Sequence, residues 1–219
     1  MKRENRKQKQ IKKFRFVLTL LTGIVIWILI MQVSNLLESI PVFHDYNECN
    51  LSSDLEDGIP LFLQSDERWA DKRYGNSDME LSGCGPTCLS MVYCGLTNDT
   101  KWDPYAVAKM AEKKGYYVKG VGTSWELMTY GAEEMGLQGE VLSFDEFHIR
   151  EALDNGNPII CAMGPGDFTT EGHFIVLVDM TEDGKIVVND PNSTENSEKY
   201  WDLDRLMEQM KNLWVYRLL

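Results

Sequence analysis

Residues 82–95 read Ser-Gly-Cys-Gly-Pro-Thr-Cys-Leu-Ser-Met-Val-Tyr-Cys-Gly. This stretch predicts a helix that opens at Gly85-Pro86, because proline is favoured at the first helical position. Gly95 predicts its end, since glycine is common just past a helix. One threonine and one serine are the only polar residues between these points, so we expect a buried helix. Cys84 falls at its N-terminus, where unpaired N–H groups and the helix dipole lower the pKa of a thiol.

The composition is that of one globular domain with some additional sequence. The chain has 219 residues, of which 43% are hydrophobic, enough for a sizeable core. Its net charge is −12, although residues 1–15 hold eight basic residues and a single acid. The rest of the chain is therefore strongly acidic, and such a surface repels nucleic acid. We expect no nucleic-acid partner.

The chain contains five cysteines, an odd number, so at least one is free or pairs between chains. They are Cys49, Cys84, Cys88, Cys94 and Cys161. Their spacing matches neither a disulfide framework nor a zinc ribbon, because Cys84 and Cys88 stand about one helical turn apart instead of flanking a two-residue gap. The sequence therefore predicts no metal and no other cofactor. It leaves open the disulfide state of the four cysteines other than Cys84.

The N-terminal region has the pattern of a membrane anchor. Residues 16–33 are uncharged and mainly apolar, about the shortest run that spans a bilayer as a helix. Residues 1–15 predict a basic cytoplasmic tail by the positive-inside rule. We expect an uncleaved signal anchor, with a cleaved signal as the alternative, because no small-residue cleavage site follows the run. The predicted localisation is the cell membrane, single-pass, with a spacer over 34–58 and an extracytoplasmic domain over 59–219.

Helices are expected in the first half of the domain. Beyond the central helix they run from Tyr105 to Lys114, from a cap at Thr123 or Ser124 to Met135, and from Phe144 to Asn155 after a cap at Ser143. Asp103-Pro104 predicts the start of the first of these, and Gly115 its end. Residues 66–80 are expected to form a surface loop. His148 is expected at the edge of a packed helix face, without a catalytic role.

Strands are expected in the second half. Apolar runs of strand length occupy Pro158–Met163, His173–Asp179, Lys185–Asp190 and, after a helix around Leu203–Lys211, Leu213–Leu218. Residues 182–184, Glu-Asp-Gly, predict a hairpin turn between the second and third runs. Because helices come first and an antiparallel sheet second, the fold class predicted is α+β.

His173 is the candidate general base. It stands at the mouth of a predicted strand, directly after a glycine and before an apolar run. A cysteine nucleophile needs such an imidazole within hydrogen-bond reach of its sulfur. Asp190 ends the partner strand of the predicted hairpin, so strand pairing brings it to the same edge as His173. There its carboxylate can hold the imidazole in one tautomer.

Gln64 completes the candidate site as a donor to an oxyanion. Acyl transfer requires hydrogen-bond donors at the position where negative charge develops. The backbone N–H of Cys84 is one candidate donor, and the side-chain amide of Gln64 is the second. Each of the four residues alone is often structural, and it is their joint occurrence in the order Gln, Cys, His, Asp that favours a catalytic site.

The motifs around these residues resemble the peptidase C39-like family of papain-like cysteine peptidases. The stretches that carry the resemblance are Gln64, Gly83–Thr87, Gly172–Val178 and Val187–Pro191, within roughly residues 59–219. The resemblance implies a papain-like fold. The roles that it implies are nucleophile for Cys84, base for His173, orienting residue for Asp190 and oxyanion donor for Gln64. Together with the expected anchor, it suggests an enzyme of a bacterial cell surface.

We therefore predict a cysteine peptidase or amidase that cleaves a peptide-like amide bond through a thioacyl intermediate on Cys84. One alternative is an acyltransferase on the same fold, which passes the acyl group to an amine. Another is a non-catalytic binding module of the cell surface. The partners expected are a peptide or peptide-like substrate and, through the N-terminal helix, the membrane.

Overall fold

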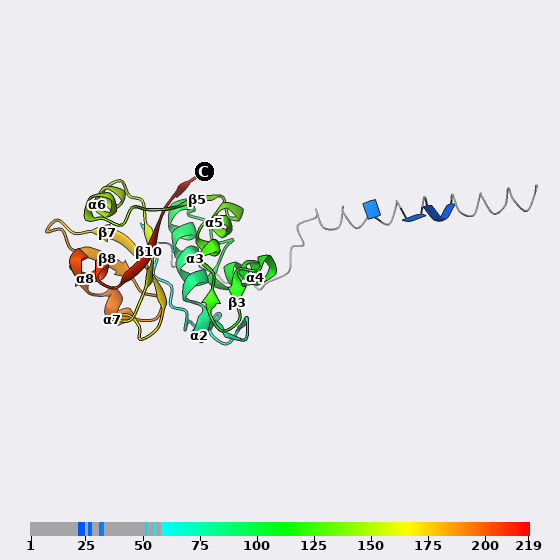
Figure 1. Cartoon of the computed structure of the whole chain (residues 1–219), viewed down its shortest axis with the longest axis horizontal. Coiled ribbons are helices and arrows are strands. Elements are labelled where there is room, and N and C mark those ends of the chain that lie inside the picture. Colours follow the sequence, from blue (N-terminus) through cyan, green and yellow to red (C-terminus); the bar gives the residue numbers. More distant parts are fainter. Residues whose placement is uncertain (1–21, 25, 28–30, 33–50, 52–54, 56–57) are drawn as a thin grey trace, which may run out of the picture. The chain divides into compact units, whose positions relative to one another are not determined.

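The computed structural model describes residues 22–24, 26–27, 31–32, 51, 55 and 58–219 (Figure 1). The chain divides into two units, Met1–Glu48 and Cys49–Leu219. The residues described in the first unit are helical. The second unit holds the motifs that the sequence singled out.

The predicted membrane localisation is corrected by the structure. A helix that crosses a bilayer needs about 20 consecutive, mainly apolar residues. Among the residues that the structure describes, no helix has both the length and the apolar character required. This finding contradicts the predicted single-pass localisation and leaves the predicted membrane partner without support. Much of the predicted anchor at 16–33, and the whole of the predicted tail at 1–15, lie outside the described residues.

A six-stranded antiparallel sheet forms the frame of the second unit, with strand order β5-β10-β6-β7-β8-β9. Its strands are β5 (Leu137–Val141), β6 (Ile159–Met163), β7 (His173–Met180), β8 (Ile186–Asn189), β9 (Tyr200–Trp201) and β10 (Met210–Leu218). The hairpin between β7 and β8 turns at Gly184, whose φ of 81° suits a residue without a side chain. The predicted hairpin is thereby confirmed.

Helices cover both faces of this sheet (Figure 1). They are α3 (Cys84–Thr97) and α4 (Pro104–Lys114) on one side, and α6 (Glu146–Asp154) and α8 (Leu203–Met207) on the other. Strand β6 lies between two hydrophobic cores, and all its residues are apolar. Ile160 and Ala162 belong to the core beneath α3, whereas Ile159, Cys161 and Met163 belong to the core on the opposite face. A strand buried on both faces reads as a continuous apolar run.

The central helix is longer than the sequence predicted. It extends over Cys84–Thr97 and ends at Asn98, which adopts the left-handed conformation (φ 53°). Gly95 lies inside the helix, so its prediction as the end was wrong. A Cβ at Gly95 would lie 2.4 Å from the Ile59 side chain, so the glycine is required by a close approach of the chain rather than by a helix end.

Helix α4 confirms its predicted signals. The Asp103 side chain accepts a hydrogen bond from the Ala106 N–H at 2.8 Å, and Gly115 ends the helix with φ of 82°. The next prediction was wrong in detail, because a break at Thr129 separates a short 3₁₀ helix, Trp125–Met128, from α5 (Tyr130–Glu134).

Helix α6 also begins later than predicted. Asp145, rather than Ser143, is its cap, accepting a hydrogen bond from the His148 N–H at 3.0 Å. His148 itself is partly exposed, and its Nδ1 lies 2.6 Å from an oxygen of Asp145.

One strand was not predicted, and another begins earlier than predicted. Strand β5 was not predicted, because Leu-Gln-Gly-Glu-Val has little strand character, yet it pairs with β10 along the edge of the sheet. The helix expected around Leu203–Lys211 ends already at Met207, and β10 starts at Met210.

Residues 66–80 are not the surface loop that was predicted. They include β1 (Arg73–Tyr74), β2 (Ser77–Asp78) and the start of α2 (Met79–Ser82). Trp69, Tyr74 and Met79 are fully buried, since large apolar and aromatic side chains gain most from burial. Leu51, within the predicted spacer, is also fully buried in the core.

The second unit is therefore an α+β structure with a buried central helix and a large antiparallel sheet. This confirms the predicted fold class. The pairing of β7 with β8 also fixes which residues share an edge of the sheet, and it is at this edge that the candidate site lies.

Candidate active site

Cys84 is the first residue of α3 and is partly exposed. Glycines on both sides of it permit close packing at the helix tip. A Cβ on Gly83 would lie 2.4 Å from the Met79 carbonyl oxygen, and one on Gly85 would lie 2.8 Å from the Thr123 side chain. No side chain caps the helix at Gly83, so the first-turn N–H groups keep their partial positive charge beside the sulfur.

The surroundings of the Cys84 thiol favour its ionised form. Burial alone would raise its pKa, but a hydrogen bond with the His173 side chain and the positive charge of that ring lower it. Hydrogen bonds from the backbone N–H groups of Phe174 and Gly85 act in the same direction. The net effect is a pKa below that of an ordinary thiol, which is the condition for a nucleophilic cysteine.

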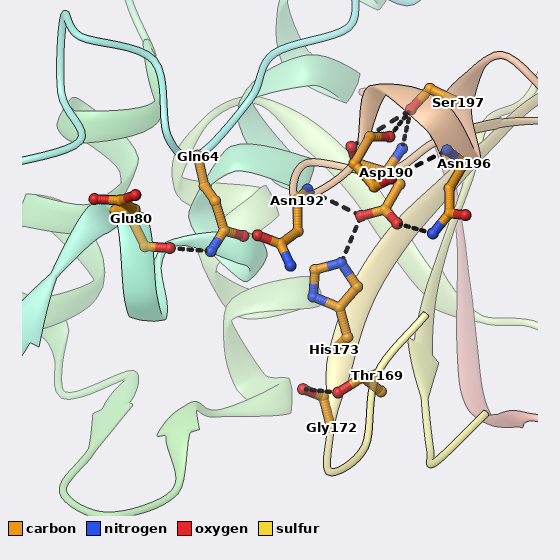
Figure 2. Close-up of polar contacts among 10 residues, drawn as sticks. Gln64, Glu80, Thr169, Gly172, His173, Asp190, Asn192, Asn196 and Ser197 are labelled. Carbon is orange, nitrogen blue, oxygen red and sulfur yellow. Dashed lines mark hydrogen bonds and ion pairs between the residues drawn. The ribbon is translucent and has the colours of Figure 1, made fainter. Parts of the chain in front are cut away.

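His173 and Asp190 are brought together by strand pairing. His173 is the first residue of β7, and Asp190 directly follows β8, where Asn189 pairs with Val176. The His173 Nε2 lies 2.7 Å from Asp190 Oδ1, and the two side chains are only 6% and 1% exposed (Figure 2). With Nε2 engaged by Asp190, the ring offers Nδ1 to the sulfur of Cys84.

The charge on His173 is stabilised by both neighbours. Burial would lower the pKa of its imidazole, but hydrogen bonds with Asp190 and Cys84, and the negative charge on each of them, raise it well above the usual value. The pKa of the thiol falls while that of the imidazole rises. This pattern is that of a thiolate–imidazolium pair held between a helix tip and a carboxylate.

Asp190 is held by residues that the sequence analysis did not identify. Its Oδ1 accepts the backbone N–H of Asn192, and its Oδ2 accepts the side-chain amide of Asn196, both at 2.9 Å (Figure 2). Its own N–H donates to Ser197 Oγ at 2.9 Å. Asn196 and Ser197 lie on the short helix α7 (Thr194–Ser197). No sequence pattern marked them, because a polar loop after a strand is ordinary.

Gln64 lies at the same edge, attached to the loop that follows Asp190. Its N–H donates to the Pro191 carbonyl at 2.7 Å, and its side-chain Nε2 donates to the Glu80 carbonyl (Figure 2). The side chain is buried, and its Oε1 has no hydrogen-bond partner among the described residues. Asn189 fixes the preceding segment by donating to the carbonyls of Ile59 and Pro60, each at 3.0 Å. Among the described residues, one N–H of the Gln64 amide therefore remains for a further acceptor.

The other cysteines that the structure describes have apolar surroundings. Cys88, Cys94 and Cys161 are buried and free, and burial raises the pKa of each thiol, to about 12 for Cys94. Cys49 lies outside the described residues. Within the described part of the chain, no group of three or more histidine, cysteine or acidic side chains is placed to hold a metal ion.

Comparison with the sequence profiles of protein families identifies one family. The profile of the Peptidase_C39 like family matches residues 56–218. No functionally curated protein sequence matches the chain. The solved structures that resemble it include two of low sequence identity.

The first is the peptidase domain of Streptococcus ComA, described as a bi-functional ABC transporter involved in a quorum-sensing pathway. It is 15% identical, with a TM-score of 0.47, over 62% of this chain and 90% of that one. The second is a double glycine motif protease from an AMS/PCAT transporter, in complex with the leader peptide. It is 13% identical, with a TM-score of 0.41, over 75% of this chain and 96% of that one.

The family profile covers most of the chain and includes Gln64, Cys84, His173 and Asp190. The central helix and antiparallel sheet agree with the papain-like fold that the resemblance implied. The chain therefore belongs to the Peptidase_C39 like family.

Proposed function

We propose that this protein is a cysteine hydrolase that cleaves a peptide or peptide-like amide bond, with Cys84 as its nucleophile. The observation that carries the proposal is the continuous chain of contacts from Cys84 to His173 to Asp190, with the pKa shifts of sulfur and ring in opposite directions. A structural cysteine has no need of such partners. A nucleophile does, because the thiolate is the reactive species.

The reaction begins with attack of the Cys84 thiolate on the carbonyl carbon of the substrate. The carbonyl π electrons move to oxygen and give a tetrahedral oxyanion. The N–H of Cys84 and the free N–H of Gln64 are the proposed donors to this oxygen. Such donors act where charge develops and are each worth about 3 kcal/mol in the transition state.

His173 then transfers its proton to the departing amine nitrogen as the C–N bond breaks, leaving a thioester on Cys84. In the second half, His173 takes a proton from water, the resulting hydroxide attacks the thioester, and the thiolate leaves. The imidazole ends protonated, as it began. Asp190 keeps the ring in the orientation required by both steps and stabilises its positive charge.

The experiment that tests this function is intact-mass spectrometry of the full chain after mixing with acyl donors. We would use p-nitrophenyl acetate as a small probe and a panel of peptides and peptidoglycan fragments as amides. A transient mass increase equal to the acyl group, located on the peptide that contains Cys84, is expected. Cys84→Ala is the matched control and should form no adduct. Absence of any adduct in the folded wild-type chain would contradict the proposal.

Addition of a primary amine during the same reaction reports the fate of the acyl group. A hydrolase returns it to water and yields the free acid. Accumulation of the acylated amine at the expense of the acid would instead identify an acyltransferase.

A further inference from the structure

We infer that Asn196 is a positioning residue for this site, acting on Cys84 and His173 through the carboxylate of Asp190. The inference rests on the proposed function and extends it to a side chain on α7, outside the four residues that carry the proposed chemistry. The two carboxylate oxygens of Asp190 form different hydrogen bonds, and Asn196 binds one of them (Figure 2).

The two Asp190 oxygens have different partners. Oδ1 faces His173 Nε2 at 2.7 Å and also accepts the N–H of Asn192. Oδ2 accepts the Asn196 amide at 2.9 Å. Among the described residues, only the Asn196 amide donates a hydrogen bond to Oδ2, so without it the carboxylate could rotate about its Cβ–Cγ bond away from the ring. The Asn196 amide therefore fixes the plane in which Asp190 meets His173.

The backbone of Asn196 is held on both sides of its side chain. Its backbone N–H donates to the Ser193 hydroxyl at 3.1 Å, and its backbone carbonyl accepts the Trp201 indole N–H at 2.9 Å. The adjacent Ser197 hydroxyl receives the Asp190 N–H and donates to the Ser193 carbonyl, both at 2.9 Å. Helix α7 is thus connected to the backbone and to the side chain of Asp190 together. Because the asparagine side chain has few rotatable bonds, it loses little conformational entropy when it binds the carboxylate.

The consequence for the site follows from charge. Hydrogen bonds to an ionised group are stronger than those between neutral groups. Asp190 is almost fully buried, so its negative charge depends on such donors. A well-oriented carboxylate stabilises the imidazolium of His173, which in turn stabilises the thiolate of Cys84. Loss of the Asn196 amide should therefore make Cys84 less reactive at acid pH.

The test is the pH profile of Cys84 alkylation in the full chain, measured with iodoacetamide and peptide-level mass spectrometry between pH about 5 and 9. Asn196→Leu removes the amide at similar size. We expect its profile to move toward alkaline pH, with labelling at pH about 6 slowed roughly 3- to 10-fold, that is by up to one pKa unit of thiolate formation. The rate at high pH should be unchanged. Asn196→Ala, which adds no bulk, should give the same shift.

Two controls separate positioning from a general structural effect. Glu195→Leu changes the neighbouring residue of α7, whose exposed side chain pairs with Lys199, and should leave the profile unchanged. In an Asp190→Ala background, Asn196→Leu should add no further shift, because the group through which it acts is gone.

A shift of equal size with and without Asp190 would overturn the inference, as would an unmoved profile in folded Asn196→Leu and Asn196→Ala. A different result would contradict the proposed function, namely that Cys84 of the wild-type chain shows no labelling at acid pH.

Discussion

Cys84 and Cys88 stand about one turn apart on the same helix and have opposite surroundings. Cys84 is partly exposed at the tip, and partners from β7 lower the pKa of its thiol. Cys88 is fully buried in the helix body, where burial and the negative charges of Cys84 and Asp190 raise the pKa of its thiol. The helix is common to both thiols. The pKa values of the two thiols differ because residues of other elements contact the sulfur at the helix tip. Substituting the site residues one at a time tests this explanation.

The largest effect is expected from His173→Ala, which should make Cys84 resemble an ordinary thiol. Without the imidazole, only backbone N–H groups, at the helix terminus and at Phe174, lower the pKa of Cys84, and proton transfer to a leaving group is lost. We expect acylation by p-nitrophenyl acetate to slow roughly 10⁴-fold, and alkylation at pH about 6 to slow roughly 10²-fold as the profile moves toward the free-thiol pKa near 8.5. Circular dichroism checks the fold. Unchanged profiles in the folded variant would remove His173 from the site.

Gln64→Ala should slow acylation without changing the pKa of the Cys84 thiol. The amide is proposed to act on the oxyanion, which forms during acylation but not during alkylation by iodoacetamide. We predict that acylation slows about 10²- to 10³-fold, while the alkylation profile of Cys84 stays unchanged. Parallel stopped-flow and labelling assays on one preparation measure both rates. If acylation is as fast as in the wild type, another donor serves the oxyanion.

Asp190→Ala should have a smaller effect on the thiol than His173→Ala, because it removes the orientation of the ring and not the ring itself. The directions of the two pKa shifts determine which way the pH profile of Cys84 alkylation moves. The pKa of Cys84 is lowered and that of His173 is raised in the native site, so reactivity is lost as pH falls through the lowered thiol pKa. Weakening the pair moves that loss to higher pH, by about one unit or tenfold at fixed pH. Alkylation from pH about 5 to 9 measures it, and a shift larger than that of His173→Ala would contradict the assigned roles.

The smallest effect on reactivity is expected from Cys88→Ser, which alters the helix body alone. The introduced hydroxyl is buried in the core beneath the sheet, and we expect the free energy of unfolding to fall by about 1–3 kcal/mol. Alkylation of Cys84 should stay within about twofold of the wild type, since none of its partners changes. Urea unfolding and labelling provide the two measurements. Loss of Cys84 reactivity in a folded Cys88→Ser chain would show that the reactivity of Cys84 depends on the packing around Cys88.

The sequence predicted much of this arrangement because its strongest signals are local. The Gly-Cys-Gly-Pro tip and the apolar helix behind it are visible as one pattern, as is the hairpin that places His173 and Asp190 at one edge. The Asp103 cap and Gly115 end of α4 are equally local. Such features depend on neighbours a few residues apart, which a sequence displays directly.

What the sequence missed depends on distant contacts. Gly95 looks like a helix end until the chain at Ile59 is seen to pass against it. The strand β5 has little strand character and is held by pairing with β10. Asn196 sits in a polar loop, and its direction toward Asp190 follows from the fold of α7. The apolar run at 16–33 was interpreted from its composition as a membrane span, and no such span exists among the described residues.

The relative reactivity of Cys84 and Cys88 in the folded wild-type chain is the most direct test of the proposed thiolate–imidazolium pair. Iodoacetamide at pH about 6, below the free-thiol pKa of about 8.5, should label Cys84 at least tenfold faster than Cys88, Cys94 or Cys161, with peptide-level mass spectrometry as the readout. The same chain in denaturant should lose this preference, because the contacts with His173 and the helix tip are gone. If Cys84 in the native chain labels no faster than a free cysteine, then no thiolate–imidazolium pair exists and the proposed catalytic site is contradicted.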